Sequence, residues 1–150
     1  MFNIMIAVDG SPHSLQAVRH GIQLAEHGLQ AHVVLAHVQK EASLLELATH
    51  DSELIANASI DAGMDLLAPA IDLLRAAGVS YEVDIRLGDA YATLLDIADT
   101  QDCQLILMGA TGESALDSIL IGSVSREVAR HSRVPVTIVK LPETQEAADD

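Results

Sequence analysis

The stretch CQLILMGATGESALDSILIGSVSREVARH, Cys103 to His131, places three different sequence signals in a row. Its apolar start, CQLILM, is typical of a strand that is buried on both faces. Glycines follow at Gly109, Gly112 and Gly122, and a helical pattern begins at Ser123. Glycine destabilises regular structure, so a cluster of glycines indicates either a tight turn or a close approach of the backbone to a ligand.

The rest of the chain repeats this alternation of apolar runs and helical patterns. Ser11 and Pro12 are typical of the first positions of a helix, and Gly28 is typical of its end. A long helical pattern covers Ser52 to Ala77, and Pro69 is expected to kink or interrupt it. Strands are expected at Phe2–Val8, Ala31–Val38, Ser80–Gly88, Cys103–Met108 and Pro135–Lys140, and further helices at Asp89–Ala98 and Ser123–His131.

This order of elements predicts an α/β fold, a doubly wound five-stranded parallel sheet with helices on both faces. In such sheets a ligand binds beyond the carboxyl ends of the strands, where the winding direction reverses. The first strand ends just before Asp9 and the fourth ends at Met108, so the loops after them face one crevice if the two strands are neighbours. We expect one domain over residues 1–141 and an acidic, disordered tail over residues 142–150.

The amino-acid composition limits which binding partners and which cellular compartment are expected. The 150 residues carry a formal net charge of −14 and only eight Lys and Arg, which argues against nucleic acids and anionic membranes. The apolar N-terminus lacks the basic flank of a signal peptide, and we expect no stretch long enough to span a bilayer, so we expect a cytoplasmic protein. Cys103 lies inside an apolar run and is the only cysteine, so we expect a small buried hydrophobe and no intrachain disulfide.

The spacing of the glycines is the strongest indication of function. Gly112 would let backbone N–H groups approach a ligand. The helix that begins with Gly122, Ser123, Val124 and Ser125 offers free N–H groups, the positive end of the helix dipole and two hydroxyls, which together suit a phosphate. A plain loop with a serine cap explains the same residues equally well. The spacing matches neither G-x-x-x-x-G-K-[ST] nor G-x-G-x-x-G.

Three segments resemble the universal stress protein family: AVDGS (Ala7–Ser11), LILMGATG (Leu105–Gly112) and IGSVSREVARHSRVPVTIV (Ile121–Val139). The resemblance covers nearly the whole chain, and the spacing G-2x-G-9x-G-[ST] goes with ATP binding in this family. It implies an adenine nucleotide alpha hydrolase-like fold, a homodimer paired through the last strand, and a regulatory function in the stress response.

The resemblance also implies a role for individual residues. Asp9 would lie beside the ribose or the phosphates, and Val38 would contact adenine through its backbone. A Mg²⁺ ion would be held mainly by the phosphates, with Asp9 as the side chain that could reach it. Many relatives carry a basic residue where this chain has Ala110-Thr111, which removes one phosphate partner, although the Thr111 hydroxyl still donates. The implied nucleotide-binding set is Ala7, Val8, Asp9, Val38, Met108, Gly109, Thr111, Gly112, Gly122, Ser123, Val124 and Ser125.

Asp9 and the histidines also have structural explanations. An aspartate before Gly-Ser-Pro is a good turn residue, so Asp9 could serve the turn alone. His13, His20 and His27 recur every seven residues, on a helix face that lies opposite the apolar positions. We therefore expect them to face solvent, too far apart to share a metal ion.

The sequence shows few features of a catalytic site. G-x-S-x-G is absent, and neither a catalytic triad nor a general base or arginine finger for ATP hydrolysis is evident. The last strand, PVTIVK (Pro135–Lys140), has the apolar character of an edge that pairs antiparallel with its own copy, although the acidic tail could cover this edge instead. We therefore expect an ATP-binding homodimer that acts as a regulatory or stress-response protein and whose conformation or partner binding depends on the nucleotide. A nucleotide-free dimeric interaction protein and a slow ATPase are the alternatives.

Overall fold

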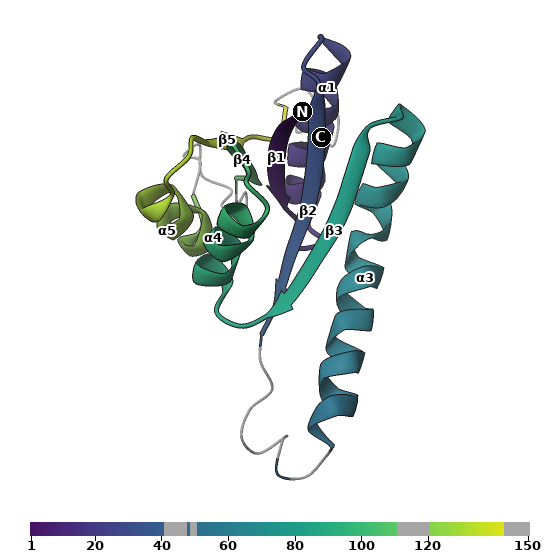
Figure 1. Cartoon of the computed structure of the whole chain (residues 1–150), viewed down its shortest axis with the longest axis vertical. Helices are drawn as coiled ribbons and strands as arrows, with labels where there is room; N and C mark the ends of the chain where they lie inside the picture. The colour runs from purple at the N-terminus through teal and green to yellow at the C-terminus, as the bar shows by residue number, and fades with distance from the viewer. Residues whose placement is uncertain (41–47, 49–50, 111–120, 143–150) are drawn as a thin grey trace, which may run out of the picture.

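The computed structural model describes residues 1–40, 48, 51–110 and 121–142. Strands and helices alternate along this part of the chain, which confirms the predicted α/β fold (Figure 1). The expected tail, apart from its first residue, lies outside the described residues. The elements are β1 (Phe2–Ala7), α1 (Pro12–Glu26), β2 (Ala31–Gln39), α3 (Ser52–Ala77), β3 (Ser80–Leu87), α4 (Ala90–Thr100), β4 (Leu105–Gly109), α5 (Ser123–His131) and β5 (Val136–Val139).

The five strands form one parallel sheet in the order β3-β2-β1-β4-β5. The chain winds from β1 outward to β3 and then crosses back to build β4 and β5 on the other side of β1. The winding direction therefore reverses between β1 and β4, which pair directly with Met5 opposite Ile106. The segments that follow these two strands consequently open at the same edge of the sheet, as the sequence predicts.

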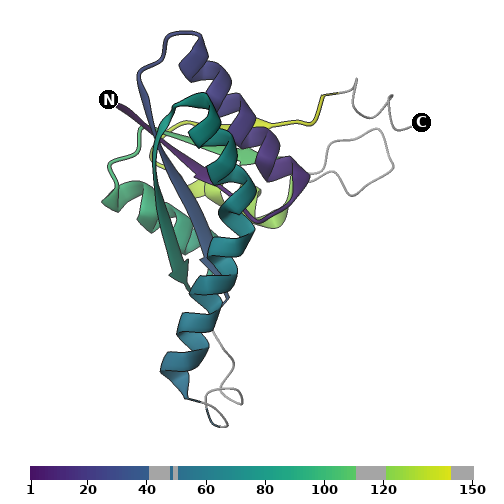
Figure 2. The ribbon, with the colours of Figure 1, turned by 90° about the vertical axis from the view of Figure 1, so that its right-hand side faces the viewer.

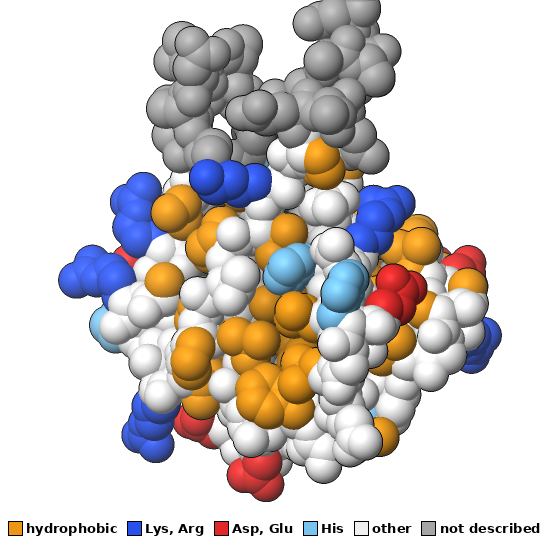
Figure 3. All heavy atoms as spheres, turned by 90° about the horizontal axis from the view of Figure 1, so that it is seen from above, with side chains coloured by type: hydrophobic (Ala, Val, Ile, Leu, Met, Phe, Trp, Pro, Cys, Tyr) orange, Lys and Arg blue, Asp and Glu red, His pale blue; other side chains and the backbone are white. Residues whose placement is uncertain are grey.

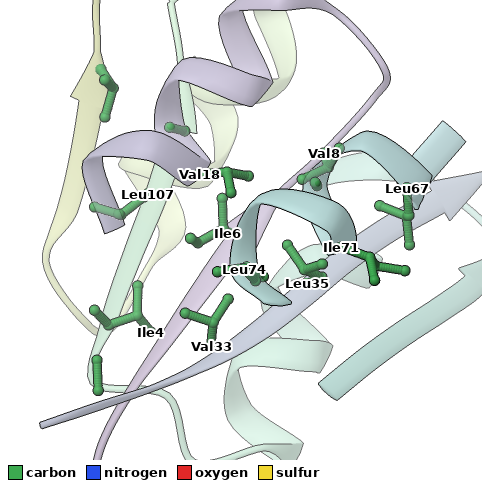
Figure 4. Packing of buried hydrophobic residues seen from close by; sticks show 14 residues of the cluster. Ile4, Ile6, Val8, Val18, Val33, Leu35, Leu67, Ile71, Leu74 and Leu107 are labelled. Carbon is green, nitrogen blue, oxygen red and sulfur yellow. The ribbon is translucent and has the colours of Figure 1, made fainter. Parts of the chain in front are cut away.

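Helices cover both faces of the sheet, and the strand side chains alternate between the two layers. Ile4 and Ile6 of β1 belong to a cluster with residues of α1 and α3, including Val18 and Leu74 (Figure 4). Met5, between them in sequence, belongs to a second cluster with residues of α4 and α5. Burial of each such aliphatic side chain stabilises the fold by roughly 1.5–3 kcal/mol, so an aromatic-poor core is sufficient.

The long helix α3 begins and ends at the residues that the sequence predicts. The Asp51 carboxylate caps its start by accepting from the backbone N–H of Glu53 at 2.8 Å, and Gly78 ends it in the left-handed conformation with φ 70°. The expected interruption at Pro69 is wrong, since the helix continues through this exposed residue. Its first turns extend beyond the ends of the strands (Figures 1 and 2).

The same helix corrects the expectation about membrane spans. Within the described residues, α3 is the one helix long and apolar enough to cross a bilayer, with a mean hydropathy of 1.2 over its best 18 residues, of which 22% are buried. Length and composition alone are weak evidence of a span, since core helices of globular proteins meet the same criteria. The buried side of α3 contributes Leu67, Ala70 and Leu74 to the core against the sheet.

Cys103 is buried just before β4, as the sequence predicts. Its burial raises the pKa of the thiol to about 11, and nearby carboxylates add to the effect. The thiolate is therefore scarce at neutral pH, and Cys103 behaves as a small apolar side chain.

Candidate functional site

A cavity of about 380 Å³ lies at the switch point, where the carboxyl ends of β1 and β4 meet. Parallel sheets of this topology form their binding crevices at this place because the loops after the two strands diverge. All the predicted nucleotide-binding residues that the structure describes line this cavity, whereas Thr111 and Gly112 lie outside the described residues. The predicted residues of the lining are Ala7, Val8, Asp9, Val38, Met108, Gly109, Gly122, Ser123, Val124 and Ser125.

The end of β1 turns into α1 through a tight, hydrogen-bonded loop. The Asp9 carboxylate accepts from the backbone N–H of Ser11 at 2.9 Å, and the Ser14 hydroxyl oxygen accepts from the backbone N–H of Asp9 at 3.3 Å. Partial burial alone would raise the pKa of Asp9, but the hydrogen bonds from Ser11 and Ser14 outweigh it and hold that pKa below its ordinary value. Asp9 is thus an ionised turn residue, and its carboxylate borders the cavity as well.

Gly109, at the end of β4, is required by packing. A Cβ built on Gly109 would overlap the carbonyl group of His13 and would lie 2.8 Å from the backbone nitrogen of Ser14. The first turn of α1 therefore lies directly against the end of β4, which only a residue without a side chain permits. Neither a turn nor a ligand, the two reasons considered from the sequence, is needed to explain this glycine.

The start of α5 supplies the polar wall of the cavity. Gly122 is the N-cap, with φ −63° and ψ 162°. Because glycine has no side chain, Gly122 makes no side-chain hydrogen bond to the N–H groups of the first turn. The backbone N–H groups of the first helical turn have no carbonyl partner within the helix. Ser123 is exposed and Ser125 is buried, and both line the cavity. This wall presents hydrogen-bond donors and the positive end of the helix dipole.

The opposite wall is apolar. It is formed by Ala36 and Val38 of β2 and by Leu94 of α4, with Met108 of β4 between the two walls. Because β2 lies on one side of β1, and β4 and β5 lie on the other side with α5 in contact with β5, the apolar residues of β2 and the start of α5 lie on opposite sides of the end of β1. The cavity is therefore amphipathic, with one side suited to a flat apolar group and the other to an anion.

Two histidines of the lining were missed as site residues. His37 follows Ala36 on β2 and is buried, with its Nδ1 2.6 Å from the carbonyl oxygen of Val8. His13 lines the cavity, and His13 and His20 are both half-buried, so the expected solvent-facing row of histidines is confirmed only for the exposed His27. The expectation rested on helical angles alone, which do not show that the first turn of α1 borders the cavity.

The remaining lining residues that the sequence did not single out are small or aliphatic. Among the described residues, no group of three or more His, Cys, Asp or Glu is placed to hold a metal ion. Within the same part of the chain, Asp9 is the one carboxylate of the lining, and neither Lys nor Arg contributes to it. These additional lining residues are Ser11, Ser14, Ala36, Ala90, Leu94 and Ala110.

The fold is that of a doubly wound α/β protein with a cavity beyond the carboxyl ends of its central strands. Residues 1–140 match the sequence profile of the universal stress protein family. The chain belongs to this family, which confirms the resemblance found in the sequence.

Relatives and solved structures agree with this assignment. The chain is 30% identical over 143 residues to the universal stress protein MJ0531 of Methanocaldococcus jannaschii, covering 95% of this chain and 84% of that protein. It is also 30% identical over 149 residues to the universal stress protein YxiE of Bacillus subtilis, covering 93% of this chain and all of that protein.

Two solved structures illustrate the likeness in fold. The hypothetical protein MJ0577 superposes with a TM-score of 0.76 at 24% identity, over 93% of this chain and 96% of that one. A universal stress protein in complex with cAMP superposes with a TM-score of 0.65 at 29% identity, again over 93% and 96% of the two chains.

Proposed function

We propose that this protein binds ATP, together with Mg²⁺, in the cavity between β1, β4 and α5. The single observation that carries the proposal is the amphipathic lining: an apolar wall on the β2 side and a wall of helix-start donors on the α5 side. A nucleotide has the same division between a flat base and a charged phosphate chain. The family membership supports the proposal, since the chain keeps the spacing Gly109, Gly112, Gly122-Ser123.

The phosphates would lie against the start of α5. Free N–H groups at a helix start bind anions, and the dipole favours negative charge there. Gly122, Ser123, Val124 and Ser125 would provide these contacts, with Gly109, Thr111 and Gly112 along the chain of phosphates. The described residues offer no preformed metal cluster, so the phosphates themselves would supply most ligands of Mg²⁺, with Asp9 as the nearest carboxylate.

The nucleoside would lie against the apolar wall. Val38 ends the lining on the β2 side, where its backbone would meet the edge of adenine, and Ala7, Val8 and Met108 would lie beneath the ring and the ribose. Asp9 would accept a hydrogen bond from a ribose hydroxyl, which spares its carboxylate a direct contact with phosphate. Two similar solved structures support adenine nucleotides as the ligand class: a universal stress protein complex with cAMP, and a family protein of Arabidopsis thaliana with AMP bound.

We further propose a homodimer that pairs through β5. This strand is the edge of the sheet, and its bonds to β4 use the carbonyl groups of Pro135 and Val139, at 3.0 and 2.8 Å. The alternation of a strand therefore directs the backbone groups of Val136 and Ile138 toward the free edge. In Figure 1, β5 lies near the upper end of the molecule, and the view of this end from above shows a group of exposed hydrophobic side chains (Figure 3).

In this proposal the protein is a cytoplasmic regulatory module of the stress response. ATP would favour whichever conformation or partner complex binds it better, and so change the population of that state. A nucleotide-free interaction protein and a slow ATPase remain the alternative functions, and the packing role of Gly109 gives the nucleotide-free alternative one specific observation in its favour.

The variant Gly122→Val tests the proposed site. The backbone of Gly122, at φ −63° and ψ 162°, is one that valine adopts readily, so the variant should fold. Its side chain would occupy the start of α5 and exclude phosphate, so we expect ATP affinity to fall at least tenfold, while the protein stays folded with a loss of about 1 kcal/mol because valine is a poor N-cap. Unchanged ATP affinity in a folded Gly122→Val protein would remove the start of α5 from the site.

A further inference from the structure

We propose that the imidazole of His13 contacts the phosphate chain of the bound nucleotide and supplies a donor to it, since neither Lys nor Arg belongs to the described lining of the cavity. This inference rests on the proposed function, because it assigns a further residue to the same site. His13 is the second residue of α1, is half-buried, and lines the cavity.

The position of His13 relative to the two walls indicates which part of a nucleotide it would meet. Its carbonyl group packs against Gly109 at the end of β4, and Ala110 follows as a lining residue. The apolar wall starts from β2, which is separated from β4 by β1. His13 therefore belongs to the side of the cavity formed by β4 and α5, where the helix-start donors lie.

The charged residues of the cavity lining show why a donor from His13 would matter for phosphate binding. Within the described lining, Asp9 contributes a negative charge and neither Lys nor Arg offsets it. The whole chain carries a formal net charge of −14, which adds to the repulsion of a phosphate chain. A ligand with several negative charges needs positive or donating groups at close range, and an imidazole provides one donor when neutral and two when protonated.

The other histidine of the lining is already committed. His37 points its Nδ1 at the Val8 carbonyl oxygen at 2.6 Å, and its Nε2 lies 3.2 Å from Oε1 of Gln39. Both ring nitrogens are thus held by the protein, in the layer between β2 and α3. His13 is the histidine of the described lining that lies on the phosphate side of the cavity.

The test compares ATP with adenosine, because these ligands differ only in the phosphate chain. Dissociation constants are measured by calorimetry for the wild-type protein and for His13→Ala, His13→Lys and His20→Ala. His20 lies two turns along the same helix, is equally half-buried, and is outside the cavity lining, so it is the matched control. We expect His13→Ala to bind ATP about tenfold more weakly, the scale of one hydrogen bond to a charged group, and to bind adenosine as the wild type does.

Two further variants, His13→Lys and His20→Ala, separate the loss of a donor at His13 from a general effect of changing a histidine on α1. His13→Lys, which keeps a donor and a positive charge, should stay within about threefold of the wild type for ATP, and His20→Ala should match the wild type for both ligands. Equal weakening of ATP and adenosine by His13→Ala would overturn the proposal, because a packing role does not distinguish them. Unchanged ATP affinity in His13→Ala would overturn it as well.

A missing phosphate contact of His13 and a missing nucleotide site give different results in these titrations. A wild-type protein that binds neither ATP nor adenosine would contradict nucleotide binding itself. A second measurement does not depend on an alanine variant that folds. The imidazole ¹H–¹³C NMR signals of the wild-type protein are recorded with and without each ligand, and the signal that is missing in His13→Gln is assigned to His13. We expect ATP to shift the His13 signal and adenosine to leave it in place, and equal shifts with both ligands would contradict phosphate contact.

Discussion

The Nδ1 atom of His37, on β2, lies 2.6 Å from the carbonyl oxygen of Val8, at the end of β1. A carbonyl oxygen only accepts, so Nδ1 carries the proton and donates. The other ring nitrogen lies 3.2 Å from Oε1 of Gln39, whose Nε2 donates to the carbonyl oxygen of Ser59 on α3 at 3.1 Å. The side chains of His37 and Gln39 thus connect the last residue before Asp9 to α3, and Val8 and His37 both line the cavity.

Removing the imidazole of His37 should destabilise the fold. His37→Leu keeps most of the buried volume and leaves the Val8 carbonyl oxygen without its donor. An unsatisfied buried acceptor costs about 1–3 kcal/mol, so we expect the free energy of unfolding to fall by that amount in urea titrations. His20→Leu, on α1, is the control, and equal stability of the two variants would contradict the role assigned to the network.

Gly109→Ala should destabilise the protein through a steric clash. Its Cβ would meet backbone atoms of His13 and Ser14, which move only if α1 shifts away from β4. Such overpacking typically costs 1–3 kcal/mol or more, and we expect the upper part of this range from denaturant unfolding. Gly78→Ala provides the comparison, since Gly78 has φ 70° and open space around its Cβ position, so its cost of about 1 kcal/mol comes from the backbone alone. A smaller loss for Gly109→Ala than for Gly78→Ala would show that the contact with α1 is loose.

Asp84 should make part of the stability dependent on pH. Its burial would raise the pKa of the carboxyl, but bonds from Arg86, at 2.9 and 3.0 Å, and from Gln101, at 3.0 Å, hold the pKa below its ordinary value of 3.8. A depressed carboxyl pKa contributes stability that is present above the unfolded-state pKa and is lost as the pH falls through the folded-state pKa.

We therefore expect Asp84→Asn to be less stable than the wild type at pH 7, and the difference to shrink as the pH falls below about 4. Urea unfolding at pH 7, 5 and 3 measures this difference. Asp61→Asn changes an exposed carboxylate on α3 and should show little difference at any of the three pH values. A gap between Asp84→Asn and the wild type that stays constant down to pH 3 would contradict the assignment.

Val136→Pro tests the proposed dimer at the β5 edge. The backbone N–H of Val136 points away from β4, so proline removes a donor of the free edge and leaves the bonds to β4 in place. We expect the molar mass from light scattering to change from dimer to monomer while the circular dichroism spectrum stays that of the wild type. A folded variant that remains dimeric would place the interface elsewhere.

Much of the fold could be predicted because the local signals agree with the tertiary structure. The apolar runs of β1 and β2 have no alternation, as expected of strands covered on both faces, and α3 begins at Ser52 and ends at Ala77 as predicted because capping residues mark both ends. The effect of Pro69 was misjudged because packing of its neighbours Leu67 and Ala70 holds the helix together across it.

Site residues could be predicted where they belong to a motif at the end of a strand or the start of a helix. They could not be predicted where contacts between segments far apart in the sequence determine their role. Asp9 and Gly122 were found because they stand at strand and helix ends. The reason for Gly109 lies in a helix nearly one hundred positions earlier in the chain, which spacing within the loop does not reveal. His37 and His13 carry no local motif either; the signal that could have found them is proximity to predicted residues, since His37 precedes Val38 and His13 follows the Ser11 cap closely.

The most direct test of nucleotide binding is a calorimetric titration of the wild-type protein with ATP and Mg²⁺, with GTP as the control. We expect saturable binding of ATP and at least tenfold weaker binding of GTP, because the apolar wall and the Val38 backbone would select the base. Absence of ATP binding up to millimolar concentration would contradict the proposed site, and the glycines between β4 and α5 would then serve the fold and a protein partner only.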